Sequence, residues 1–224
     1  MPRLQAILFD LDGTLADTAP DLGNAANCLL QEEGRAPRPL AELRPYTSQG
    51  VRGLLFATFG LTPDAPGYER LAARFLELYA ARLCVESCLF AGVEQLLAMI
   101  EEAGLAWGIV TNKRMRYTDP LVRQLGLSPR TRCVVSGDTT TAAKPSPLPI
   151  LHACELLVSE PERCIYIGDD RRDIEAGRAA GCRTIAAAYG YLGDSGHPAS
   201  WGADHLVASP AELHLLLEQD LIGR

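Results

Sequence analysis

The stretch Ala6-Ile7-Leu8-Phe9-Asp10-Leu11-Asp12-Gly13-Thr14-Leu15 decides how the rest of the chain is interpreted. Its short apolar run, closed by turn-forming residues, predicts a buried parallel strand that ends at Asp10. Because alternate residues of an extended chain share a face, the Asp10 and Asp12 side chains should reach the same point beyond the strand. Two carboxylates that close repel each other unless a cation or a shared proton intervenes, and Mg2+ prefers such oxygen ligands. Taken alone, the motif is also compatible with an ordinary Asx-type turn.

The composition is that of a globular protein. Hydrophobic residues make up 47% of the 224 residues and charged residues 22%, with a net charge of −7. This charge disfavours nucleic acid and anionic membranes as partners. No run of 18 apolar residues predicts a membrane span, and the early apolar run is interrupted by aspartates, unlike a signal peptide. We therefore expect a cytoplasmic protein.

Cysteine and histidine usage gives no indication of zinc. The seven cysteines are scattered and form no CxxC pair, and the four histidines do not cluster. Buried, reduced thiols in the cytosol are the simplest interpretation.

A helical insertion is predicted directly after the first strand. Between residues 17 and 83 no segment resembles a buried strand, and apolar residues recur at helical intervals. The predicted helices cover residues 21–33, 39–43, 50–59 and 68–83. We expect a helical cap domain at residues 18–87, and a core domain formed by residues 1–17 and 88–224.

From Gly92 onward the pattern alternates between helix and strand, which predicts a parallel sheet with crossover helices. The predicted strands are 106–110, 133–136, 164–167, 184–187 and 205–207. The predicted helices are 93–103, 120–125, 147–157, 174–180 and 210–221. The fold class is therefore α/β, a doubly wound parallel sheet of Rossmann-like type. The order of the strands cannot be read from this pattern.

Polar residues follow several of these strands, where ligands bind in such sheets. Thr111 and Asn112 come directly after the second core strand, and Lys144 lies in a proline-rich loop after the third. Asp169 and Asp173 follow the next one, four residues apart. Each feature alone has a simpler interpretation, namely a turn, a solvated lysine or a helix cap. Asp170 is the less suitable metal ligand by register and is expected to cap the following helix.

Four segments together resemble the signatures of the haloacid dehalogenase superfamily, in the branch that transfers phosphoryl groups. They are Asp10-Leu11-Asp12-Gly13-Thr14, Thr111-Asn112, Lys144-Pro145 and Gly168-Asp169-Asp170-Arg171-Arg172-Asp173. The resemblance implies an Mg2+-dependent phosphatase in which Asp10 forms an aspartyl-phosphate and Asp12 is the general acid and base.

The same resemblance implies roles for the other residues. Thr111 and Lys144 would act with the catalytic aspartates by binding phosphoryl oxygens, and Gly13 and Asn112 would contact the substrate. Its metal ligands would be Asp10, Asp169, Asp173 and the main-chain carbonyl of Asp12.

Substrate choice is expected to depend on the cap. The segment 46–52 is polar and contains Arg52, which suits a carboxylate, although a solvated helix start explains it equally well. The chain resembles the phosphoglycolate phosphatase subfamily, and segments 46–55 and 189–204 resemble bacterial N-acetylmuramic acid 6-phosphate phosphatases of peptidoglycan recycling. The implied substrate is a small carboxylated phosphate ester, N-acetylmuramic acid 6-phosphate or 2-phosphoglycolate.

Three other classes of protein share part of this pattern. A phosphosugar mutase on the same scaffold would return the phosphoryl group to a sugar instead of releasing phosphate. A response-regulator receiver is about half as long and lacks an insertion after its first strand, and a silent binding protein is disfavoured because no signature residue is missing. The sequence leaves monomer and homodimer open.

Overall fold

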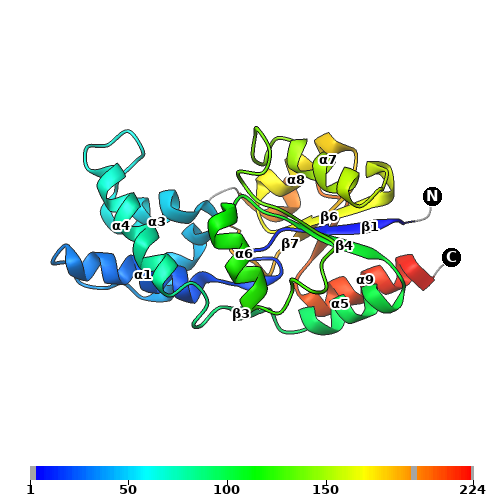
Figure 1. Ribbon diagram of the computed structural model, residues 1–224, viewed down its shortest axis with the longest axis horizontal. Helices are drawn as coiled ribbons and strands as arrows, with labels where there is room; N and C mark the ends of the chain where they lie inside the picture. The colour runs from blue at the N-terminus through cyan, green and yellow to red at the C-terminus, as the bar shows by residue number, and fades with distance from the viewer. Residues whose placement is uncertain (1–3, 193–195, 223–224) are drawn as a thin grey trace.

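A six-stranded parallel sheet forms the centre of the molecule (Figure 1). The computed structural model describes residues 4–192 and 196–222. The strand order is β5-β4-β1-β6-β7-β8, and every neighbouring pair is parallel. The strands are β1 (Ala6–Phe9), β4 (Ala106–Val110), β5 (Cys133–Val135), β6 (Cys164–Gly168), β7 (Arg183–Ala187) and β8 (His205–Val207). The predicted α/β core is confirmed.

Strand β1 lies in the middle of this sheet, between β4 and β6. All of its residues are buried, and alternate residues enter different cores. Ile7 and Phe9 belong to the hydrophobic cluster on one face, whereas Ala6 and Leu8 belong to the cluster on the other. This explains a continuous apolar run. Because the strand order reverses beside β1, a crevice forms beyond its carboxyl end.

Helices cover both faces of the sheet. In Figure 1, α7 (Leu148–Leu156) and α8 (Arg171–Ala180) lie above it, and α5 (Val93–Glu102) and α9 (Pro210–Ile222) lie below. Within each pair the two helices contact each other. No helix in the described ranges is long and apolar enough to cross a membrane.

Two helices begin earlier than the sequence predicts. Helix α6 covers Met115–Gln124, although its proline suggested a start at Pro120. Pro120 lies inside the helix, and the Met115 N–H at the true start donates to the Asp138 carboxylate (2.8 Å). Helix α8 begins at Arg171 rather than residue 174 because Asp170 caps it.

The segment between β2 (Ala16–Asp17) and β3 (Cys88–Leu89) is helical, as predicted. It contains α1 (Ala19–Glu32), α2 (Leu40–Leu43), the 3-10 helix η1 (Arg44–Gln49), α3 (Gly50–Phe59) and α4 (Tyr68–Ala81). Helix α1 packs against α3 and α4, and the group lies to one side of the sheet in Figure 1. β2 and β3 pair antiparallel where the chain enters and leaves it, which the sequence does not predict. The cap boundaries at 18 and 87 stay a prediction.

Candidate active site

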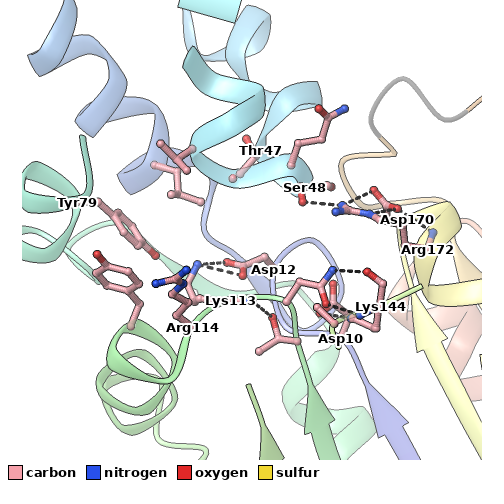
Figure 2. Close-up of a pocket in the computed structure, with 18 of the residues that line it drawn as sticks. Asp10, Asp12, Thr47, Ser48, Tyr79, Lys113, Arg114, Lys144, Asp170 and Arg172 are labelled. Atoms are coloured by element: carbon pink, nitrogen blue, oxygen red, sulfur yellow. Dashed lines mark hydrogen bonds and ion pairs between the residues drawn. The ribbon is translucent and has the colours of Figure 1, made fainter. Parts of the chain in front are cut away.

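Side chains that follow different strands meet in a pocket of about 480 Å³ at the carboxyl edge of the sheet (Figure 2). Asp10 and Asp12 follow β1, and Thr111 follows β4. Lys144 comes from the loop after β5, and Asp173 from the first turn of α8. Residues 47–51 of the helical segment line the facing wall. The structure thus brings these residues together, while the roles assigned to them stay predictions.

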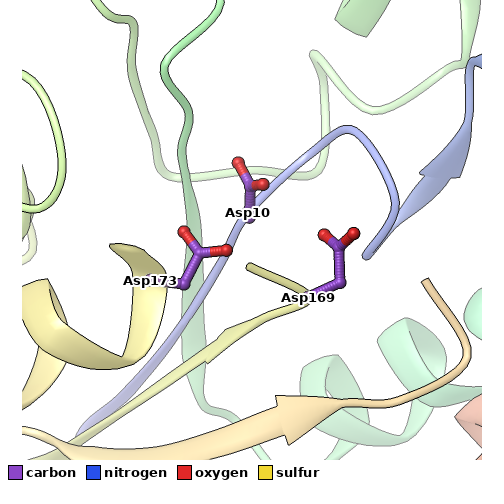
Figure 3. A group of neighbouring side chains, drawn as sticks. All are labelled: Asp10, Asp169 and Asp173. Atoms are coloured by element: carbon purple, nitrogen blue, oxygen red, sulfur yellow. The ribbon is translucent and has the colours of Figure 1, made fainter. Parts of the chain in front are cut away.

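Asp10, Asp169 and Asp173 form a buried carboxylate cluster (Figure 3). One oxygen from each lies within 4.8 Å of the others. Burial raises the pKa of Asp10 to about 7, although the Lys144 ammonium acts in the opposite direction. Burial and the neighbouring carboxylates of Asp10 and Asp173 hold the pKa of Asp169 well above its usual value. These oxygens repel one another when ionised and are the ligand type that Mg2+ prefers, so the site fits this cation.

The Lys144 ammonium is the fixed positive charge beside this cluster. Its Nζ lies 2.9 Å from Asp10 Oδ1 and 2.7 Å from Asp173 Oδ1. It also donates to the Val110 carbonyl (2.8 Å) and the Tyr166 hydroxyl (2.7 Å). Burial lowers the pKa of Lys144, but the two carboxylates outweigh burial and raise it. With 5% of its surface exposed, Lys144 is not a solvated lysine.

Asp12 points away from the carboxylate cluster and is held by other groups. Lys113 Nζ donates to both of its carboxylate oxygens (2.9 and 3.0 Å), and the Thr18 hydroxyl donates to one of them. Burial lowers the pKa of Lys113, but Asp12 raises it more. The carboxylate of Asp12 is therefore not a member of the metal-binding set. A contribution from its main-chain carbonyl stays a prediction.

Two glycines allow the backbone to approach Asp169 closely. Gly13 has a φ of +88°, and a Cβ at Gly13 or at Gly190 would collide with the Asp169 carboxylate. The Thr14 hydroxyl (2.9 Å) and the Tyr191 N–H (2.8 Å) donate to the two oxygens of that carboxylate. The glycines thus allow the packing that fixes Asp169. Gly13 can contact a substrate only through its backbone.

The haloacid dehalogenase-like hydrolase family model matches residues 7–187, which include all of these strand ends. The chain belongs to this family. It is 44% identical over 219 residues to an N-acetylmuramic acid 6-phosphate phosphatase of Pseudomonas aeruginosa, covering 98% of this chain and 97% of the relative. It is 45% identical over 210 residues to a phosphoglycolate phosphatase of Xanthomonas campestris, covering 93% and 94%. The resemblance drawn from the signatures is confirmed.

Solved structures support the same fold for this hydrolase. A predicted phosphoglycolate phosphatase from Haemophilus somnus superposes with a TM-score of 0.84 at 24% identity, over 97% of this chain and 99% of the other. One from Lactobacillus delbrueckii superposes with a TM-score of 0.83 at 22% identity, over 96% and 99%. At this identity the likeness shows the fold alone.

The hydrolase's fourth signature is organised by a capping box at the start of α8. The Asp170 carboxylate accepts the Arg172 N–H (2.9 Å), and the Asp173 carboxylate accepts the Asp170 N–H (3.0 Å). Asp170 therefore caps the helix, as predicted. The same contacts fix Asp173 so that it can point toward Asp10.

Asn112 lies in the pocket lining, as the sequence suggested, whereas Arg52 does not. The Asn112 amide donates to the Lys144 carbonyl and accepts the Lys144 N–H, both at 2.9 Å. Its side chain is therefore occupied in holding the Lys144 loop, although the residue lines the pocket. Arg52 is exposed and is not among the pocket-lining residues. The structure does not bring it to the site.

Tyr79, Lys113 and Arg114 line the pocket and were not predicted from the sequence. Thr47 and Ser48, which also line it, belong to the predicted segment 46–52, and Arg172 belongs to the fourth signature but had no predicted role. The Arg172 guanidinium donates to the Ser48 carbonyl (2.9 Å) and to the Asp170 carboxylate, so it joins α8 to η1. Lys113 and Arg114 directly follow a strand end, and that position is a usable indication. Tyr79 lies in a distant helix, and nothing local distinguishes it.

Proposed function

We propose that this hydrolase is an Mg2+-dependent phosphatase acting on a small phosphate ester that carries a carboxylate. The observation that carries the proposal is the buried group of Asp10, Asp169, Asp173 and Lys144 at the strand ends. The names of the two relatives support it, because N-acetylmuramic acid 6-phosphate and phosphoglycolate are both carboxylated phosphate esters.

In the first step, a carboxylate oxygen of Asp10 attacks the phosphorus in line. The bond between phosphorus and the ester oxygen breaks, and Asp12 gives a proton to the departing oxygen. Thr111 and Lys144 line the pocket beside Asp10 and would bind the other phosphoryl oxygens. The product of this step is an aspartyl-phosphate on Asp10 and a free alcohol.

In the second step, water attacks the phosphorus of the aspartyl-phosphate. Asp12 accepts the proton of that water, the bond between phosphorus and the Asp10 oxygen breaks, and inorganic phosphate leaves. The two hydrogen bonds from Lys113 Nζ hold the Asp12 carboxylate in place beside the reaction site. Asp10 returns to its starting state.

Asp10, Asp169 and Asp173 would hold the Mg2+, with the Asp12 carbonyl as a further ligand. When bound, the cation neutralises negative charge on the transferring phosphoryl group. Residues 18–87 would act as a cap that excludes water, since residues 47–51 line the pocket opposite Asp10. A cytoplasmic location and a monomeric or homodimeric state are further parts of the proposal.

The test measures phosphate release with Mg2+ from N-acetylmuramic acid 6-phosphate, phosphoglycolate and common hexose phosphates. We expect a preference for the acidic esters, and loss of turnover in Asp10→Asn and Asp12→Ala variants that remain folded by circular dichroism. Wild-type-like turnover by either variant would refute the assigned roles. Isomerisation of a sugar phosphate without phosphate release would favour a mutase.

A further inference from the structure

The pocket continues beyond the phosphate end into a region with a different lining. In the view of Figure 2, Arg114 and Tyr79 lie on the far side of Asp12 from Lys144. The apolar residues that line the pocket are Leu22, Val51, Phe75, Leu76, Tyr79 and Tyr117, together with Ala143. Such a mixture of apolar walls and a few polar groups is typical of a site for an organic group rather than for phosphate alone.

The charges along the pocket are paired, with one exception. The lining cations are Lys113, Arg114, Lys144 and Arg172. Lys113 is paired with Asp12, Lys144 with Asp10 and Arg172 with Asp170. Within residues 4–192 and 196–222, Arg114 pairs with no carboxylate, and its surface is exposed. Arg114 is thus the lining cation that is available to an anionic group of the substrate other than the phosphate.

Tyr79 supplies a second available polar group nearby. Its side chain is 2% exposed and lies beside the Lys113 ammonium, which is 5.0 Å from the ring centroid. In the described part of the chain, its hydroxyl makes no hydrogen bond of standard geometry. The neighbouring Lys113 ammonium is a donor only, so the hydroxyl proton has no acceptor there. A buried hydroxyl without a partner is costly, so a ligand that accepts its hydrogen bond would relieve this cost.

We propose that Arg114 and the Tyr79 hydroxyl bind the carboxylate of the substrate, and that this substrate is an acidic sugar phosphate. A guanidinium binds a carboxylate through two parallel hydrogen bonds, and the apolar walls would contact the methyl and acetyl groups of a substituted sugar. In phosphoglycolate the carboxylate is close to the phosphate and would meet Lys113 and Asp12 first. The inference rests on the proposed phosphatase function.

The test compares N-acetylmuramic acid 6-phosphate with N-acetylglucosamine 6-phosphate, the same sugar phosphate without the lactyl carboxylate. Arg114→Gln should lower the ratio of kcat/KM for the acidic over the neutral ester about 10-fold, or about 1.4 kcal/mol. The loss should appear in KM, because the carboxylate contact is the same in the ground and transition states. Arg114→Lys should restore part of it, and Tyr79→Phe should lower the ratio several-fold without lowering Tm.

Arg123→Gln is the matched control, because it removes the same charge from the exposed side of α6, away from the pocket lining. It should leave the ratio unchanged. Equal losses on both esters in Arg114→Gln, or an unchanged ratio, would overturn the inference. If Arg114→Gln lowers kcat/KM more for a sugar bisphosphate than for the acidic ester, the group that Arg114 binds is a second phosphate, and the inferred carboxylate contact is wrong.

Calorimetric binding of both esters to the Asp10→Asn variant, with and without Arg114→Gln, tests the contact independently of turnover. If the wild type releases no phosphate but Asp10→Asn binds the acidic ester more tightly through Arg114, the proposed function fails and this inference stands. If phosphate is released but Arg114→Gln binds both esters as before, the proposed function stands and this inference fails.

Discussion

Replacing Asn112 by alanine should slow the reaction by displacing Lys144 rather than by weakening substrate binding. The Asn112 amide makes two reciprocal hydrogen bonds to the Lys144 backbone, both at 2.9 Å. Among the hydrogen bonds of the described residues, no other group bonds to the Lys144 backbone N–H or carbonyl. Without the amide, the Lys144 backbone loses both contacts and can shift, although the ammonium keeps its own contacts with Asp10, Asp173, Val110 and Tyr166.

The expected magnitude follows from these contacts. Each hydrogen bond contributes about 1 kcal/mol, and water can reach this half-buried position and replace part of it, so the loss should be about 1–2 kcal/mol. For a chain of 224 residues this corresponds to a Tm lower by about 2–8 °C. A shift of about 1 Å in a catalytic group can lower kcat roughly 100-fold.

The assay combines scanning calorimetry with steady-state kinetics on a generic aryl phosphate. Asn27→Ala is a matched control, because the Asn27 amide makes the same reciprocal pair with the Arg38 backbone (2.9 and 2.8 Å), away from the pocket lining. It should lower Tm by a similar amount and leave kcat unchanged. If Asn112→Ala keeps its Tm and kcat and raises only KM, then Asn112 contacts the substrate and the positioning role is wrong.

Two further predictions concern the charges of the site. Asp169→Asn removes one of three carboxylates whose oxygens lie within 4.8 Å, so the gain in Tm on adding Mg2+ should largely disappear; a gain equal to that of the wild type would contradict a metal site there. Lys113→Met keeps the apolar stem beside Tyr79 but leaves the Asp12 carboxylate without its cation. It should lower the free energy of unfolding by about 3 kcal/mol and kcat at least about 10-fold, with partial recovery in Lys113→Arg, as measured by urea unfolding and kinetics. Unchanged stability would mean that the ion pair contributes little.

The strand framework and much of the phosphate end could be predicted from the sequence because they depend on local pattern. An apolar run that ends in Asp10 predicts a buried strand, and the carboxyl ends of parallel strands necessarily meet at one edge. That rule is sufficient to bring Thr111, Lys144 and Asp173 toward Asp10. The cap function of Asp170 also follows from its register at the start of a helix.

What only the tertiary structure decided is how these polar groups are paired. The Asn112 amide could bind a ligand, but it already forms two hydrogen bonds with the Lys144 backbone. Arg52 lies on an exposed surface rather than in the pocket. Conversely, among the described residues Arg114 forms no ion pair with a carboxylate and the Tyr79 hydroxyl proton has no acceptor, so both groups are available to a substrate.

The reason is physical. Strand and helix formation follow from the spacing of apolar residues along the chain, whereas a polar side chain's function depends on which partners already satisfy it. Those partners come from elements far apart in the sequence, as with Lys113 and Asp12 or Tyr191 and Asp169. The sequence by itself therefore determined where the chemistry is located, and the packing of distant elements decided which groups remain available to a substrate.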